Sequence, residues 1–213
     1  MRLEDYTADA ICQSMGLRFI EHSWAQAETP TLRVVLTPSF HPELCITLSR
    51  TADAVRLSVV ALTRQFWSQG SGVVLPTECE EAHLSSKDFD EVLALFAGVR
   101  AGFDTQGRYV CVDGMGSMAC LVSRAGTQRF EAHVSEHRPA GQLVVRLIEL
   151  AWNACRQPRV RNALAQVARY LSIEYPVEEV PPQPATTPLA VLGTPEGRHD
   201  YFEMLRQSKK DKG

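Results

Sequence analysis

The chain has 213 residues, of which 45% are hydrophobic and 22% charged, and its formal net charge is −3. This composition is ordinary for a globular protein and supplies enough apolar side chains for a buried core. The nearly balanced charge lacks the basic excess that is usual in nucleic-acid binders, and no stretch approaches the roughly 18 uninterrupted apolar residues of a membrane span.

The first part of the chain predicts one short helix and then a series of strands. Residues 5–16 have an amphipathic pattern that ends in glycine, and residues 17–24 have the composition of a strand. Three β-rich runs follow at 31–38, 43–50 and 54–67. The last two runs alternate apolar with polar or small side chains, which is typical of strands with one buried face. The short polar connection "RTADA" predicts a hairpin between these two runs.

Residues 85–103 ("SSKDFDEVLALFAGVRAGF") predict the clearest helix. Ser85 is a favourable N-cap, and Asp88 can complete a capping box with it. An apolar stripe follows at helical spacing, and Gly102 is well placed to end the helix. The stripe consists of Phe89, Val92, Leu93 and Phe96.

The following segment predicts three adjacent antiparallel strands, at 107–114, 117–124 and 127–134. Pro139 then opens a long helix, because proline is favoured at the first helical position. Pro158 interrupts that helix and starts a second one. Together these elements predict an α+β fold, in which an antiparallel sheet or meander is packed by amphipathic helices.

The glycine-rich stretch "CVDGMGSMACLV" (111–122) is best interpreted as a turn between two strands. It lacks the third glycine of a dinucleotide loop, the Gly-Lys-Ser/Thr ending of a P-loop and the glycine spacing of a nucleophile elbow. A four-residue loop at 114–117 would place Cys111 opposite Cys120. We favour a plain hairpin with Asp113 as a turn residue over a redox-active pair, which requires a lowered thiol pKa.

Cysteine and histidine residues offer two enzymatic alternatives, a metal site and a hydrolytic site. Cys45 and His41 are a candidate nucleophile and base, respectively, but no local signature marks this or any other cysteine as catalytic. Four residues of extended strand span about 13 Å, which is too far for one zinc ion to bridge. We therefore expect no metal and no other cofactor. The pairs with metal-like spacing are Cys79 with His83 and His133 with His137.

Clusters of charge are interpreted as solvated surface. The acidic runs "ECEE" (78–81) and "VEEV" (177–180) do not present two carboxylates poised for acid–base chemistry. A basic cluster on the last helices is interpreted as a solvated helix face, with an acidic partner or a phosphate as the alternative. That cluster consists of Arg156, Arg159, Arg161 and Arg169.

The N-terminal sequence "MRLEDYTADA" is acidic from the start and has no apolar segment of a secretory signal. The cysteines are widely scattered, as is typical of buried thiols in a reducing compartment. We therefore expect a cytoplasmic protein. The six cysteines are Cys12, Cys45, Cys79, Cys111, Cys120 and Cys155.

The composition changes after Tyr175, and we predict a single α+β domain over 1–172 and a tail over 173–213. The first part of the tail is rich in proline and threonine, as in an extended linker. The segment "HDYFEMLRQ" then predicts a short helix with the form of a helix-in-groove ligand. Docking onto a protein partner and docking back onto the chain's own domain are equally compatible with it. The candidate protein-binding residues are Tyr201, Phe202, Met204 and Leu205.

The order of "LSSKDFDEVLALFAGVRAGF", "VDG…LVSRAGTQRF…HRP" and a long apolar helix resembles a loosely defined group of small bacterial α+β domains. In that group a β-meander and a helix precede a D-G strand, a G-x-x-x-F strand and a proline-started helix. The resemblance spans residues 32–155, and Met118 stands where the group often has a large aromatic residue. It implies an antiparallel α+β fold and no particular activity.

We expect a non-enzymatic protein-binding or accessory domain of the bacterial cytosol, such as an immunity protein or an adaptor. The sequence motivates this by what it lacks, since no convergent polar cluster stands out. The alternative is a hydrolytic or metal-dependent enzyme that uses a Cys/His cluster. A protein partner is expected, with self-association open and neither membrane nor nucleic acid as a partner.

Overall fold

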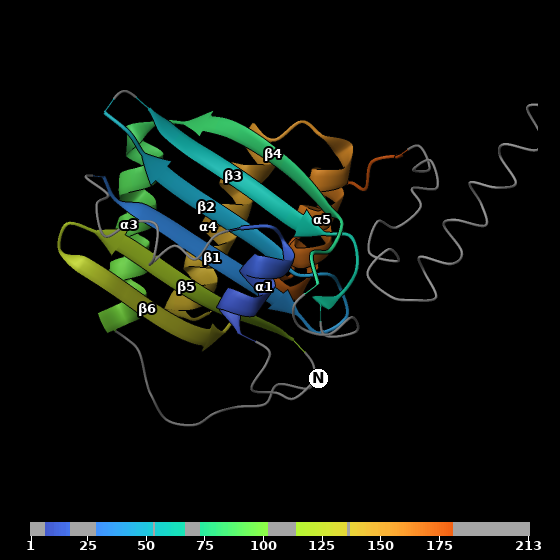
Figure 1. Cartoon of the computed structure of the whole chain (residues 1–213), viewed down its shortest axis with the longest axis horizontal. Helices are drawn as coiled ribbons and strands as arrows, with labels where there is room; N and C mark the ends of the chain where they lie inside the picture. The colour runs from blue at the N-terminus through green and yellow to red at the C-terminus, as the bar shows by residue number, and fades with distance from the viewer. Residues whose placement is uncertain are drawn as a thin grey trace, which may run out of the picture. The chain divides into compact units, whose positions relative to one another are not determined.

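Six antiparallel strands form one sheet in the part of the chain that the computed structural model describes, residues 7–17, 29–52, 54–66, 73–101, 114–135 and 137–180 (Figure 1). The strands follow one another in the order β4-β3-β2-β1-β5-β6. β4 is one edge strand of the sheet. In the chain, helix α3 follows β4 and precedes β5, which pairs with β1. The strands are β1 (Thr31–Pro38), β2 (Leu44–Arg50), β3 (Val55–Leu62), β4 (Thr77–Leu84), β5 (Met115–Ser123) and β6 (Gly126–His133).

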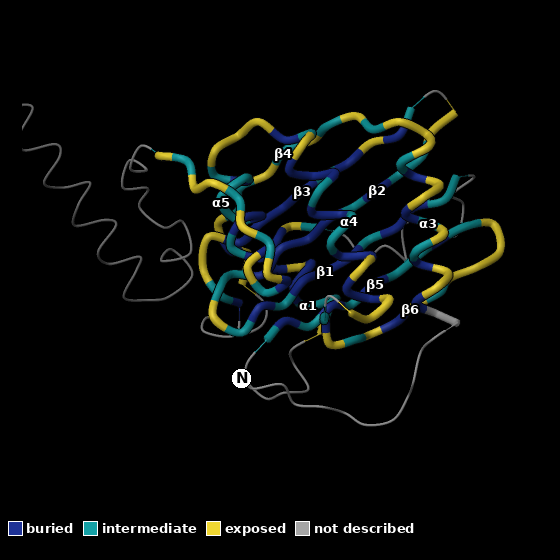
Figure 2. Tube along the Cα trace, turned by 180° about the vertical axis from the view of Figure 1, so that it is seen from behind, coloured by how far each residue is buried: buried dark blue, intermediate teal, exposed yellow. Residues whose placement is uncertain are grey.

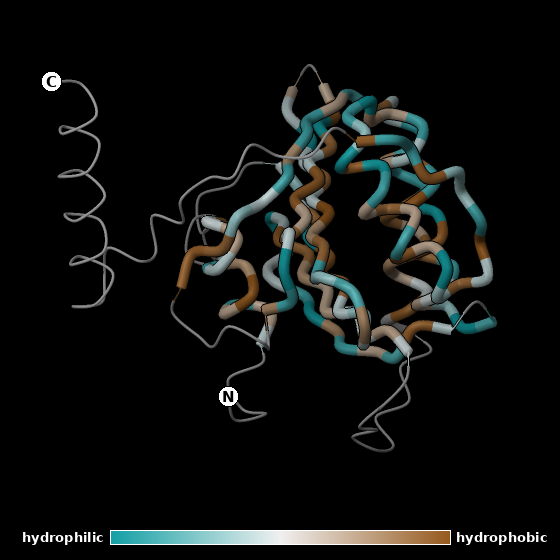
Figure 3. Tube along the Cα trace, turned by 90° about the vertical axis from the view of Figure 1, so that its right-hand side faces the viewer, coloured by the Kyte–Doolittle hydropathy of each residue, from teal (hydrophilic) through white to brown (hydrophobic). Residues whose placement is uncertain are grey.

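One face of the sheet carries the larger hydrophobic core, beneath three helices. Alternate residues of β1 to β3 point into this core, where they meet apolar side chains of the helices. Figure 3 shows apolar residues along the strands and along the helices beside them, and these residues belong to the larger core. These helices are α3 (Ser86–Ala101), α4 (Pro139–Ala154) and α5 (Pro158–Ala168), and α5 runs into the short 3-10 helix η3 (Arg169–Leu171).

The opposite face carries a smaller core beneath α1 (Ala8–Ser14). Ile11 and Cys12 of α1 pack with Val35 and Cys45, which alternate with the residues that face the larger core. Figure 2 shows buried residues concentrated in the central strands, whereas the outer strand β6 carries more exposed ones.

The structure confirms the α+β fold and most of the elements with strong local signals. Strands β2 and β3 form the expected hairpin. The backbone N–H of Asp88 donates to Ser85 Oγ at 3.1 Å, so Ser85 caps α3 as predicted. Pro139 and Pro158 occupy the first turns of α4 and α5. No helix in the described ranges is both long enough and apolar enough to cross a membrane.

Two sequence-based interpretations are wrong. Residues 78–81, interpreted only as solvated charge, belong to strand β4. The predicted four-residue loop at 114–117 does not exist, because β5 begins at Met115 and pairs with β1 on one side and β6 on the other. Cys120 therefore lies opposite Arg33 on one side and Arg129 on the other, and Cys111 lies outside the described residues.

Several predicted features lie outside the described residues. They are the strand at 17–24 except for Leu17, the strand at 107–114 except for Gly114, the turn residue Asp113, Gly102, Cys111, and the tail from Pro181 onward with Tyr201, Phe202, Met204 and Leu205.

Candidate functional site

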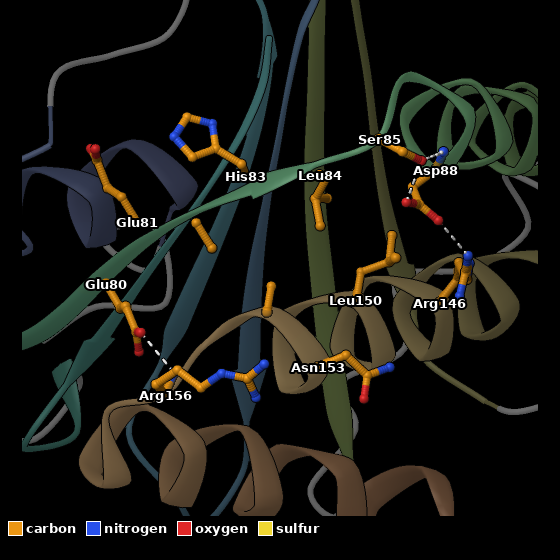
Figure 4. A pocket seen from close by; sticks show the side chains of 12 residues that line it. Glu80, Glu81, His83, Leu84, Ser85, Asp88, Arg146, Leu150, Asn153 and Arg156 are labelled. Carbon is orange, nitrogen blue, oxygen red and sulfur yellow. Dashed lines mark hydrogen bonds and ion pairs between the residues drawn. The ribbon is translucent and has the colours of Figure 1, made fainter.

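A groove of about 730 Å³ lies between β4 and the helices beside it, and we call it the β4 groove (Figure 4). Its walls come from β4, from the residues that begin α3, from one face of α4 and from the turn after α4. Its lining residues are Glu80, Glu81, Ala82, His83, Leu84, Ser85, Asp88, Arg146, Leu150, Asn153, Ala154 and Arg156.

Strand β4 places its side chains alternately on the two faces of the sheet, as a strand must. Glu81 and His83 are exposed and point away from α4, whereas Glu80 and Leu84 point toward it (Figure 4). β4 is the last strand on its side of the sheet, so no described strand pairs with its outer side. An edge strand of this kind presents unpaired backbone N–H and C=O groups.

Glu80 stabilises the beginning of α5. Its carboxylate accepts hydrogen bonds from the backbone N–H groups of Arg156, at 2.7 Å, and Gln157, at 2.8 Å. A negative charge at this position also interacts favourably with the helix dipole. The neighbouring Cys155 thiol is fully buried, and burial followed by the charge of Glu80 raises its pKa to about 12. This end of the groove is therefore a fixed structural joint.

A charged cluster with an excess of negative charge lies at the α3 end of the groove, where Asp88 and Arg146 line the groove and Glu91 and Glu149 lie beside Arg146. The Arg146 guanidinium contacts Asp88 and Glu91 at 2.9 Å each, and Glu149 at 3.6 Å. One positive charge thus faces three carboxylates. All four side chains are partly exposed, so they can still interact with a bound molecule.

Between these two ends the groove has an apolar floor and a polar rim. Leu84 and Leu150 point into the groove, and Asn153 lies on its rim (Figure 4). The side chains of Asn153 and Arg156 are exposed. This arrangement can receive the alternating side chains of an extended chain that lies along β4.

The structure separates His41 from Cys45, the residues of the hydrolytic hypothesis. His41 Nδ1 lies 3.0 Å from the hydroxyl oxygen of Tyr170, at the far end of the helix layer. Partial burial, followed by the charge of Arg169, lowers the pKa of His41. Cys45 is buried in the small core beneath α1. The two side chains therefore belong to different parts of the domain and do not form a dyad.

The structure also shows where the candidate metal ligands lie. Cys79 and His83 are exposed on the same face of β4, at the two ends of a four-residue extended stretch. His133 ends β6, and His137 precedes α4. Within the described residues, no three His, Cys, Asp or Glu side chains are arranged to hold a metal ion.

Some members of the three charged clusters form ion pairs within the fold, although all three clusters were expected to be solvated surface. Of the acidic runs, Glu78 pairs with Arg159 at 3.2 Å, and Glu178 pairs with Arg161 at 2.8 Å. Unlike Arg159 and Arg161, the Arg156 side chain is exposed. The basic residues of the last helices are therefore distributed among separate contacts and do not form one anion-binding face.

Sequence reasoning missed β4, and with it the groove. In β4 only Ala82 and Leu84 are apolar residues at alternate positions. The two earlier positions on the same face are Glu78 and Glu80, which bond to Arg159 and to the N-cap of α5. That short alternation was the one available signal. No protein family model, no curated protein and no solved structure matches this chain.

Proposed function

We propose that this chain is a non-enzymatic protein-binding domain, which takes up an extended segment of a partner protein along the outer side of β4. The observation that carries the proposal is the β4 groove, which borders an eight-residue edge strand. An extended peptide can add to such an edge through backbone hydrogen bonds, while its alternate side chains enter the groove. Exposed edge strands are usually short or covered. β4 has eight residues and no described strand on its outer side, so its edge can accept an added strand.

The charges of the β4 groove favour a partner segment that carries lysine or arginine. The cluster around Arg146 has one guanidinium against three carboxylates, and this difference leaves a net charge of two negatives. A basic side chain reaching this end neutralises part of the excess. Leu84 and Leu150 supply apolar surface for the next side chain on the same face of the peptide.

The cellular setting that we propose is the bacterial cytosol, with an adaptor or an immunity protein as the kind of molecule. The resemblance to small bacterial α+β domains supports the first part of this proposal. None of the five cysteines in the described part of the chain is in a disulfide, which is usual for a reducing compartment. An adaptor or immunity protein acts by covering a partner's surface, and this requires a docking strand and no reacting groups.

The test uses a synthetic peptide of alternating valine and lysine as the probe. Hydrogen–deuterium exchange of the full chain should slow at the amides of β4 and stay unchanged at β6 when the peptide is added. A matched peptide with glutamate in place of lysine should bind about tenfold more weakly or worse. Equal protection of both edges, or none, would refute the proposal.

Paired variants test the contribution of charge. The double change Glu91→Gln and Glu149→Gln removes the negative excess and should weaken binding of the lysine peptide. Glu131→Gln removes one exposed carboxylate from β6, on the opposite edge, and should have no effect. Protection of β4 that grows with protein concentration in the absence of peptide would identify a second copy of the chain as the occupant.

A further inference from the structure

The small core beneath α1 contains a pair of thiols that the proposed function does not use. Cys12 of α1 and Cys45 of β2 are 4% and 1% exposed, and their side chains share a hydrogen bond. The two residues are far apart in the sequence, so only the packing of α1 on the sheet brings them together.

Two polar side chains complete the surroundings of this pair. Arg33 Nε donates a hydrogen bond to Thr47 Oγ1 at 3.0 Å, and Thr47 Oγ1 lies 3.9 Å from Cys45 Sγ. Arg33 also forms a hydrogen bond with Cys12. A guanidinium and a hydroxyl group therefore lie beside two sulfurs that are otherwise surrounded by Val35, Val60 and other apolar residues.

These neighbours make the two thiols chemically unequal. The hydrogen bond from Cys12, followed in effect by the charge of Arg33, lowers the pKa of Cys45 despite its burial. The same hydrogen bond, together with burial, raises the pKa of Cys12. One thiol of the pair thus donates to the other, and the Arg33 guanidinium beside both sulfurs favours a thiolate.

We propose that Cys12 and Cys45 are a redox-active pair, which a hydroperoxide converts into a disulfide that joins α1 to β2. The Cys45 thiolate attacks the peroxide oxygen, which gives a sulfenic acid and releases hydroxide or alkoxide. The Cys12 thiol then attacks the sulfenic sulfur, forming the S–S bond and releasing water. In total two thiols lose two hydrogens and two electrons, and the peroxide is reduced to water, or to water and an alcohol.

The attachment of α1 makes this pair accessible despite its burial. The helix has seven residues, and its described contacts to the sheet side include apolar packing, a backbone bond from Leu75 N–H to Ser14 O, the hydrogen bonds of Cys12 and an exposed ion pair between Asp9 and Arg129 at 4.0 Å. Short elements with few buried contacts open locally at low cost. The disulfide then holds α1 on the sheet, so oxidation changes how readily this face opens.

In the test, the reduced full-length protein is treated with hydrogen peroxide. The remaining thiols are then alkylated under denaturing conditions, and the disulfide is located by peptide mass mapping. We expect a Cys12–Cys45 disulfide and slower amide exchange in α1. Cys12→Ser and Cys45→Ser should each abolish the disulfide, and the exposed Cys79→Ser should form it at an unchanged rate. Oxidation of Cys79 or Cys120 with both buried thiols still free to alkylate would overturn the proposal.

A second variant keeps both cysteines and does not depend on the folding of the serine variants. Arg33→Gln removes the charge beside the pair and should move the pH midpoint of the oxidation rate upward and slow oxidation several-fold near neutral pH. Arg56→Gln changes an exposed arginine on the same face of the sheet and should leave both quantities unchanged. An identical pH profile in both variants and the wild type would contradict the role of Arg33.

Discussion

At the scale of single residues, Glu80 links the edge strand to the helix layer. Its side chain leaves β4 and accepts both backbone hydrogen bonds at the start of α5. Gln157, at the N-cap position, makes no side-chain cap of its own. A residue that is distant in sequence therefore accepts from the N-cap N–H, as the glutamate at the third helical position does in a capping box.

Replacing Glu80 with alanine should lower the free energy of unfolding by about 1–2 kcal/mol, because two N–H groups lose their acceptor. Urea denaturation measures this change. The matched control is Glu81→Ala, which removes the exposed neighbouring carboxylate and should change stability by less than about 0.5 kcal/mol. Equal effects of the two replacements would mean that Glu80 contributes only general surface charge.

The buried Cys155 thiol should make stability depend on alkaline pH. Its pKa is about 12 in the folded chain and 9.0 in the unfolded reference, chiefly because of burial. Between these values the folded state holds a proton that the unfolded state has lost, so stability falls as pH rises. Cys155→Ala should reduce the loss of stability between about pH 8 and about pH 10, measured as urea midpoints.

Other groups titrate in the same range and set the background of that experiment. The pKa values of Cys12 and Tyr175 are also raised, so the wild type and the variant both lose some stability at high pH. Only the difference between the two proteins reports on Cys155. Parallel curves would show that this thiol does not hold its proton more tightly in the folded state.

At the scale of elements, the segment after η3 is attached to the helices by specific contacts. The Asn162 side chain donates to Glu178 O and accepts from Glu178 N–H, both at 2.8 Å. The ring of Tyr175 stacks on Trp152 with centroids 4.2 Å apart, and Arg161 lies over Trp152 at 4.1 Å. The predicted linker thus begins with residues that pack on the domain.

Replacing Asn162 with alanine should loosen this segment without unfolding the sheet. It leaves the backbone groups of Glu178 without their partner, at a cost of about 1–3 kcal/mol. Hydrogen exchange should accelerate at Glu178 and remain unchanged in β2. Asn153→Ala is a suitable control, since Asn153 is an exposed asparagine on the neighbouring helix α4. Unchanged exchange at Glu178 would contradict the expected role of Asn162.

The same elements explain which features the sequence predicts. Ser85, Pro139 and Pro158 fix helix starts through their own backbone and side-chain chemistry, so their signals are local. The β4 groove and the thiol pair have no such signal. Cys12 meets Cys45 only after α1 has packed on the sheet, and no spacing in the sequence indicates that contact.

At the scale of the whole chain, the described contacts form a domain that ends close to Val180. The buried apolar residues extend to Leu171, and the bonds to Glu178 attach the segment that follows. Residues Met1–Val180 also form one structural unit. The boundary expected at residue 172 would cut through the contacts of Tyr175 and Glu178, so the position of a truncation should decide its effect.

A chain shortened to residues 1–180 should keep the melting temperature of the full chain to within about 2 °C, because it retains every described contact. A chain shortened to 1–172 should melt several degrees lower, since Trp152 loses its stacked partner and Asn162 both of its bonds. Differential scanning calorimetry compares the three proteins. A marked fall for the 1–180 chain would show that the tail with Tyr201, Phe202, Met204 and Leu205 docks onto its own domain. An unchanged value leaves that apolar segment available to a partner, and binding of the isolated segment to candidate partners then becomes the next measurement.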